Sequence, residues 1–147
     1  MGQVAIDIAT SLLTWANTSN IVNNAFSMGE YLRLTSDDFL CCGPPLFHAF
    51  GLVVGLMATF TRGATIGFAG RDFEVAPVVD MLVKERCTAL HGVPTMFYAI
   101  LNEIERLGIE IKTIKKGVAA GTKVPPALHE EIQRRLGYEH VTIAYGE

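Results

Sequence analysis

An aromatic side chain and a histidine follow two prolines near the middle of the sequence, and together they could bind and orient a ligand. The run from Gly43 to Gly51 reads Gly-Pro-Pro-Leu-Phe-His-Ala-Phe-Gly. If a strand precedes the prolines and a helix follows them, Phe47 and His48 lie at the carboxyl end of a strand, where open α/β sheets bind ligands. From spacing alone, the simpler interpretation of His48 is a packed loop histidine.

A second candidate is a small-residue turn further along the chain. Gly121 and Thr122 follow an apolar stretch and precede Lys123 and the pair Pro125-Pro126. Small residues let a backbone approach a flat ring closely. Without its neighbours, the same pattern is an ordinary loop between a strand and a helix.

The elements that must position these residues alternate between helix and strand patterns, with Gly and Pro between them. This alternation predicts βα units and a mainly parallel sheet with flanking helices, which is an α/β fold. Strands are expected at 39–42, 64–68, 88–91, 114–120 and 141–144, and helices at 20–32, 47–60, 73–86, 94–107 and 127–136.

Several helix ends carry recognisable signals. Asp72 is the expected N-cap of the third helix, and Pro94 opens the fourth. Gly108 and Gly137 are expected to end the last two helices, because glycine adopts the left-handed conformation that follows a helix. The apolar run in the second helix is too short to cross a bilayer, so a buried helix is expected there.

Composition excludes several classes of function. Of the 147 residues, 18% are charged, and the net charge of -3 leaves no basic surface for nucleic acid or anionic lipid. The partner is expected to be a small molecule or a protein. Cys41, Cys42 and Cys87 show neither disulfide nor zinc spacing, and they fit a reducing, cytoplasmic location.

The order and spacing of these motifs resemble the adenylate-forming (AMP-binding) superfamily, in its fatty acyl-CoA synthetase branch. The family resemblance rests on the run from Gly43 to Gly51 and on Ala144 to Glu147, and it extends over residues 19–146. The branch is judged from residues 20–24 (Asn-Ile-Val-Asn-Asn) and from Pro45 to Gly51. The chain is similar to an internal fragment of the large N-terminal domain. We therefore divide it into an atypical N-terminal segment, residues 1–18, and a partial AMP-binding domain, residues 19–147.

The resemblance implies roles for six residues. Phe47 and His48 would border the acyl and adenylate pocket, with His48 positioning the carboxylate and not acting as a general base. Gly121 and Thr122 would form the turn against adenine. Tyr145 and Gly146 match the start of a Tyr-Gly-x-Thr-Glu motif, in which the tyrosine stacks on adenine. No metal ligand is assigned, since Glu147 stands two positions too early for the motif's glutamate.

Complete relatives use ATP, CoA and Mg²⁺ to convert a carboxylic acid to acyl-AMP and then to acyl-CoA. The resemblance implies a medium- or long-chain acid here, with the cytoplasm expected and the peroxisome an alternative, although no C-terminal targeting tripeptide is present. The family's phosphate loop, metal glutamate and C-terminal catalytic lysine have no counterpart in this sequence, so the chain is expected to be weak or inactive alone.

Two alternatives stay open. One is a non-catalytic binding or interaction module that forms homo- or hetero-oligomers through an exposed apolar surface. The other is an inert remnant that does not fold stably. No membrane-spanning segment is expected in either case.

Overall fold

Five parallel strands form one sheet in the computed structural model, which describes residues 18–145. The strands lie in the order β2-β1-β3-β4-β5. They are β1 (Phe39–Cys42), β2 (Thr65–Gly67), β3 (Ala89–His91), β4 (Lys116–Ala119) and β5 (His140–Ile143). Parallel neighbours require a crossover connection, and each connection here contains a helix. The carboxyl ends of all five strands therefore meet at one edge, and the predicted α/β class is confirmed.

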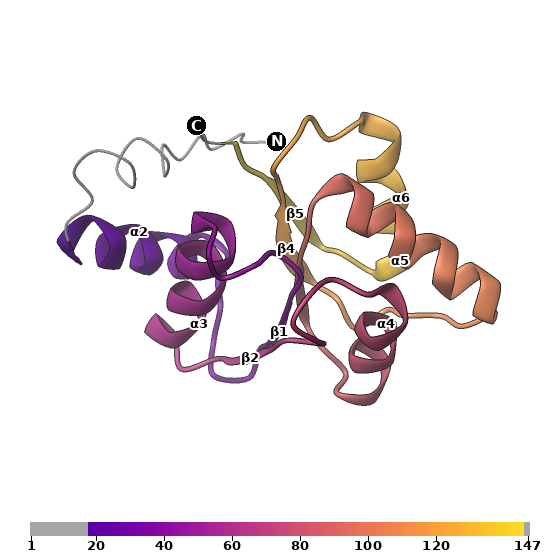
Figure 1. Ribbon diagram of the computed structural model, residues 1–147, viewed down its shortest axis with the longest axis horizontal. Coiled ribbons are helices and arrows are strands. Elements are labelled where there is room, and N and C mark those ends of the chain that lie inside the picture. Colours follow the sequence, from indigo (N-terminus) through magenta and orange to yellow (C-terminus); the bar gives the residue numbers. More distant parts are fainter. Residues whose placement is uncertain (1–17, 146–147) are drawn as a thin grey trace.

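Helices cover both faces of the sheet. They are α2 (Thr18–Tyr31), the π-helix η1 (Phe50–Met57), α3 (Ala58–Thr61), α4 (Val75–Lys84), α5 (Pro94–Leu107) and α6 (Pro126–Leu136). Figure 1 shows α2 and α3 on one side of the sheet and α4, α5 and α6 on the other. Within the described part of the chain, every helix is too short or too polar to cross a lipid bilayer.

The strands alternate side chains between two apolar cores, because successive residues of a strand point to opposite faces. Leu40, Ala89 and Val118 join the core beneath α2 and η1. Their chain neighbours Cys41, Leu90 and Ala119 join the larger core beneath α4, α5 and α6. Burial on both faces explains why β1 is a continuous apolar run.

The predicted helix ends at the two glycines are confirmed. Helix α5 begins at Pro94 and ends before Gly108, which has φ of 63°. Helix α6 ends before Gly137, with φ of 85°. Both values lie in the left-handed region that favours glycine.

The predicted N-cap at Asp72 is wrong. Helix α4 begins at Val75, and Glu74 precedes it with an extended backbone. Pro77 gives the physical reason. In a helix that starts at Phe73, residue 77 would donate a hydrogen bond to the carbonyl of Phe73, but Pro77 has no N–H and its ring would clash with that carbonyl. Starting at Val75 places Pro77 in the first turn, where that N–H has no helical partner.

The long buried helix expected at residues 47–60 is only partly confirmed. Residues 50–57 are π-helical, and α3 continues them. Phe47 and Phe60, at the two ends of the expected helix, are exposed. Gly51 packs against the carbonyl groups of Pro44 and Pro45, so the helix starts directly against the proline pair.

Candidate functional site

Five of the six candidate residues lie at the carboxyl edge of the sheet. Phe47 and His48 follow β1, Gly121 and Thr122 follow β4, and Tyr145 follows β5. Gly146 lies outside the described residues. Because ligands of open parallel sheets bind at this edge, the fold brings the sequence-predicted residues to the region where a site would form.

His48 caps the start of η1 with its side chain. Its Nδ1 lies 3.0 Å from the amide nitrogen of Phe50, which donates the hydrogen bond. The amide of Leu52 donates to the carbonyl of His48 at 2.9 Å, which begins the helical pattern. With Nδ1 accepting, the neutral imidazole carries its proton on Nε2. His48 is exposed, so this Nε2–H is a donor available at the sheet edge.

Phe47 and the turn after β4 differ in how tightly they are held. The Phe47 side chain is 93% exposed. Gly121 has φ of 91°, and a Cβ at this position would lie 2.8 Å from Cγ1 of Val93. The turn therefore requires glycine on both conformational and steric grounds. Thr122 and Lys123 follow it on the surface.

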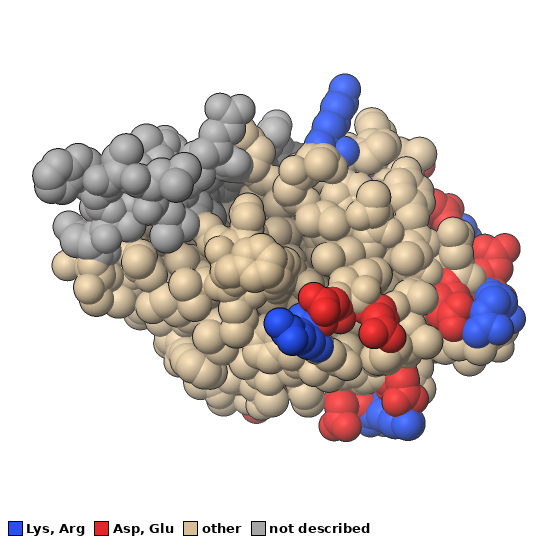
Figure 2. Space-filling model, viewed as in Figure 1, with Lys and Arg blue, Asp and Glu red and all other residues tan. Residues whose placement is uncertain are grey.

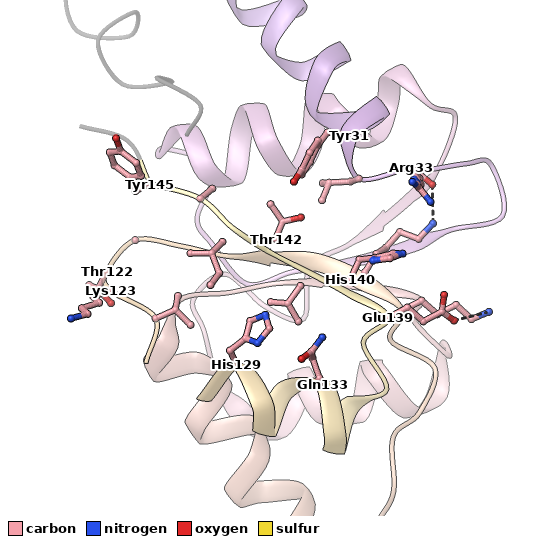
Figure 3. A pocket seen from close by; sticks show the side chains of 18 residues that line it. Tyr31, Arg33, Thr122, Lys123, His129, Gln133, Glu139, His140, Thr142 and Tyr145 are labelled. Atoms are coloured by element: carbon pink, nitrogen blue, oxygen red, sulfur yellow. Dashed lines mark hydrogen bonds and ion pairs between the residues drawn. The ribbon is translucent and has the colours of Figure 1, made fainter. Parts of the chain in front are cut away.

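A groove with a volume of about 1130 Å³ runs along β5. Figure 3 shows Thr122, Lys123 and Tyr145 toward one end of it, with Arg33 and Glu139 toward the other. Gly121 also lines it, whereas Phe47 and His48 do not. Gly121, Thr122 and Tyr145, the candidates for nucleotide binding, therefore lie at one end of the groove. Phe47 and His48, the candidates for the acyl pocket, lie after β1 and outside the groove.

Sequence reasoning missed most of the side chains that line this groove. Tyr31 of α2 and Thr142 of β5 lie on one face of the strand, and His129 and Gln133 of α6 lie on the other (Figure 3). The four-residue spacing of His129 and Gln133, which places both on one side of a helix, was the available signal.

His91 is fully buried at the end of the central strand β3. The amide of Val118 donates to its Nδ1 at 3.2 Å, and its Nε2 lies 3.3 Å from the carbonyl oxygen of Val54. The ring stacks on Phe50, with centroids 5.8 Å apart. Burial lowers the pKa of His91 to about 4, against the opposing effect of its backbone hydrogen bonds. The imidazole is therefore neutral at pH 7.

The charged groups of the described residues give no metal centre. No three His, Cys, Asp or Glu side chains within residues 18–145 come together as a set of metal ligands. On the face seen in Figure 2, acidic and basic side chains lie side by side, one group just below the middle and the others along the right and lower margins. The described residues form no metal centre by themselves, and no step through a Mg²⁺ ion is derived for them.

Residues 15–147 match the family model described as AMP-binding enzyme, and the chain belongs to that family. Over 127 residues it is 42% identical to the acyl-CoA ligase sidI of Aspergillus fumigatus, a match that covers 86% of this chain and 22% of that protein. It is 37% identical over 131 residues to the human mitochondrial medium-chain acyl-CoA ligase ACSF2, covering 86% of this chain and 21% of that protein.

Solved structures agree with this membership. A malonyl-CoA ligase in a ternary product complex with methylmalonyl-CoA and AMP superimposes with a TM-score of 0.70 and 25% identity. The match covers 86% of this chain and 28% of that one. The chain thus spans about a fifth of the length of the curated relatives it matches.

Proposed function

We propose that this chain forms the nucleotide- and acyl-facing part of an acyl-CoA ligase, which activates a medium- or long-chain carboxylic acid through acyl-AMP. One observation carries the proposal: five separately predicted residues lie after three parallel strands, at the same sheet edge. The names of the relatives support the ligase class, and ACSF2 supports the medium-chain range.

The nucleotide end would lie where Gly121, Thr122 and Tyr145 line the groove. Tyr145 is 64% exposed, so its ring is free to stack on adenine. The turn at Gly121 lets backbone approach the base, and the exposed ammonium of Lys123 beside it would attract phosphate.

The acyl end would lie at Phe47 and His48. The Nε2–H of His48 is a donor suited to orienting a carboxylate. Its Nδ1 already accepts from Phe50, so His48 cannot take up a proton there without releasing the start of η1. This geometry supports a positioning role and argues against a general base.

Activity of the chain by itself is proposed to be weak or absent. Charge stabilisation by metal ions and cationic groups supplies much of the rate in such reactions. Residues 18–145 offer no metal-ligand cluster. We expect binding of a nucleotide and an acid here, with ATP, CoA and Mg²⁺ serving the reaction as they do in complete relatives. All three cysteines are buried free thiols, which supports a reducing, cytoplasmic location.

Acid-dependent exchange between ATP and pyrophosphate tests the activity, measured on monodisperse protein with Mg²⁺ and short, medium and long fatty acids. AMP and fatty-acid binding, measured by calorimetry, tests the site separately. Binding without exchange is the expected result. Exchange above that of a His48→Ala variant would contradict the weak-activity proposal, and a folded protein that binds neither ligand would contradict the assigned site.

The second candidate function is an interaction module, favoured by apolar side chains exposed on α2 and α3. Val22, Phe26 and Phe60 are each more than two-fifths exposed. Concentration-dependent self-association, measured by analytical ultracentrifugation in the absence of ligand binding, would favour this function over the ligase.

A further inference from the structure

We propose that His91 is a positioning residue, which holds the acyl-side helix η1 at a fixed place relative to the nucleotide-side strand β4. This proposal rests on the proposed function, because that function assigns one end of the site to the acyl group and the other to the nucleotide. The contacts themselves are independent of any ligand.

The strand order gives His91 its place. Strand β3 lies between β1, which leads to Phe47 and His48, and β4, which leads to Gly121 and Thr122. His91 is the last residue of β3, at the carboxyl edge. A side chain at this point can contact the elements next to both candidate ends, and the two ring nitrogens of His91 contact Val54 in η1 and Val118 in β4.

The hydrogen bonds between β3 and β4 are interrupted at this residue. The carbonyl of Val118 accepts from the amide of Gly92, and the carbonyl of Gly92 accepts from the amide of Ala120. Bonds in a parallel ladder repeat every second residue, so the amide of Val118 would normally donate to the carbonyl of Leu90. It donates instead to Nδ1 of His91, at 3.2 Å.

The displaced carbonyl has a replacement partner. The hydroxyl of Tyr138 donates to the oxygen of Leu90 at 2.7 Å. Two side chains therefore replace one ladder bond, and neither polar backbone group is left unpaired.

The partners also fix the tautomer of His91. A backbone amide can only donate, so Nδ1 is the acceptor and the proton is on Nε2, from which it is donated to the carbonyl of Val54 in η1. Phe50 connects this pair to the acyl end. Its ring stacks on His91, and its amide donates to His48. Movement of β4 and movement of η1 are thus joined through one buried imidazole.

The test uses three variants of the full chain labelled with ¹⁵N. His91→Phe removes both hydrogen bonds and keeps an aromatic ring beside Phe50. His91→Asn keeps an acceptor for the Val118 amide but is too short to reach Val54. Tyr138→Phe is the matched control, since it removes a buried hydrogen bond at the same junction from the opposite face of the sheet.

The amide resonances of Phe50, Gly121 and Thr122 are the readout. His91→Phe is expected to shift all three, His91→Asn to shift mainly Phe50, and Tyr138→Phe to leave Phe50 in place. Unshifted resonances in a folded His91→Phe protein would overturn the proposal. Equal shifts of Phe50 in His91→Phe and Tyr138→Phe would also overturn it, because general loosening would then explain both.

Two further measurements test the role of His91 apart from the amide resonances. If His91→Phe fails to fold, the ¹⁵N shifts of His91 in the unsubstituted protein still test the geometry, and a proton on Nδ1 at pH 7 would overturn it. Calorimetry with AMP should show roughly 2- to 30-fold weaker binding in His91→Phe, the range for substitutions that act without touching the ligand. Unsubstituted protein that binds no AMP would refute the proposed function, while the resonance shifts would still decide the role of His91.

Discussion

The ammonium group of Lys116 lies 3.0 Å from Oδ2 of Asp38 and 2.8 Å from the carbonyl oxygen of Arg33. The hydroxyl of Thr88 donates to Oδ1 of the same carboxylate at 2.7 Å. These residues come just before β1 and β3 and at the start of β4, so one buried carboxylate joins the amino ends of three neighbouring strands. The network lies at the amino edge of the sheet, where Arg33 and Lys116 line the end of the groove away from Tyr145.

Replacing Asp38 by Asn should lower the free energy of unfolding by roughly 2–4 kcal/mol, because the Lys116 ammonium loses its charge partner while only 19% of its side chain is exposed. Urea unfolding at pH 7 measures this change. Lys84→Met is the control, since the pair Lys84–Asp80 is exposed to solvent and should contribute much less to stability than the buried pair. Equal losses in the two variants would contradict the structural role of Asp38.

Stability should fall between pH 6.5 and about 4 because of His91. Burial lowers its folded-state pKa from 6.5 to about 4. In that window the unfolded chain binds a proton that the folded chain does not, so unfolding becomes easier by up to roughly 1.4 kcal/mol per pH unit. Urea unfolding at pH 7, 6 and 5 measures the slope. His91→Phe should reduce it and Tyr138→Phe should not, so unchanged slopes in both variants would contradict the assignment.

Protonation of Asp38 should also lower the free energy of unfolding, but at a lower pH than protonation of His91. Burial raises its pKa, but hydrogen bonds from Thr88, Lys116 and Thr35 outweigh burial and hold the pKa below 3.8. The stability it contributes is present above that value and is lost as pH falls through the lower folded-state pKa. The loss of this stability should therefore begin only near pH 4, below the range of the His91 transition. Unfolding measured at closely spaced pH values should show the two losses as separate steps, and Asp38→Asn should remove only the step at lower pH.

Gly51→Ala should destabilise the fold even though alanine favours helices. Its Cβ would overlap the carbonyl oxygens of Pro44 and Pro45. Alanine gains about 1 kcal/mol in helix propensity, whereas overpacking against fixed backbone costs about 1–3 kcal/mol, so the net loss is expected to be at most about 2 kcal/mol. Thermal unfolding compares it with Gly70→Ala, where the nearest atom, Asp72 O, is 3.4 Å away. A higher melting temperature for Gly51→Ala than for Gly70→Ala would contradict this packing.

Tyr145→Ala should weaken AMP binding by roughly 5- to 150-fold if the ring stacks on adenine, since one stacked base contributes about 1–3 kcal/mol. Tyr145→Phe retains the ring and should bind nearly as well as the unsubstituted protein. Tyr98→Ala is the control, because Tyr98 is similarly exposed but lies on α5, away from the groove. Calorimetry with AMP gives the comparison, and equal affinities for Tyr145→Ala and Tyr98→Ala would remove Tyr145 from the site.

Local signals predicted most of the fold. The four apolar residues of β1 and the Pro94 and Gly108 ends of α5 match their expected positions, because short-range sterics decide them. The N-cap of α4 was missed because two local signals competed, and the backbone requirement of Pro77 outweighed the capping preference of Asp72. Helix η1 is π-helical and starts against the proline pair, and periodicity did not predict this form.

Sequence by itself determined the α/β class, the family and the order of the candidate residues along the chain, because periodicity and motif spacing are properties of neighbouring residues. Only the tertiary structure decided which residues meet. Asp38 and Lys116 are 78 positions apart, and His91 and Val118 are 27 apart. Strand register brings these pairs into contact, and register is set by how two cores fill on the two faces of the sheet, which no local pattern contains.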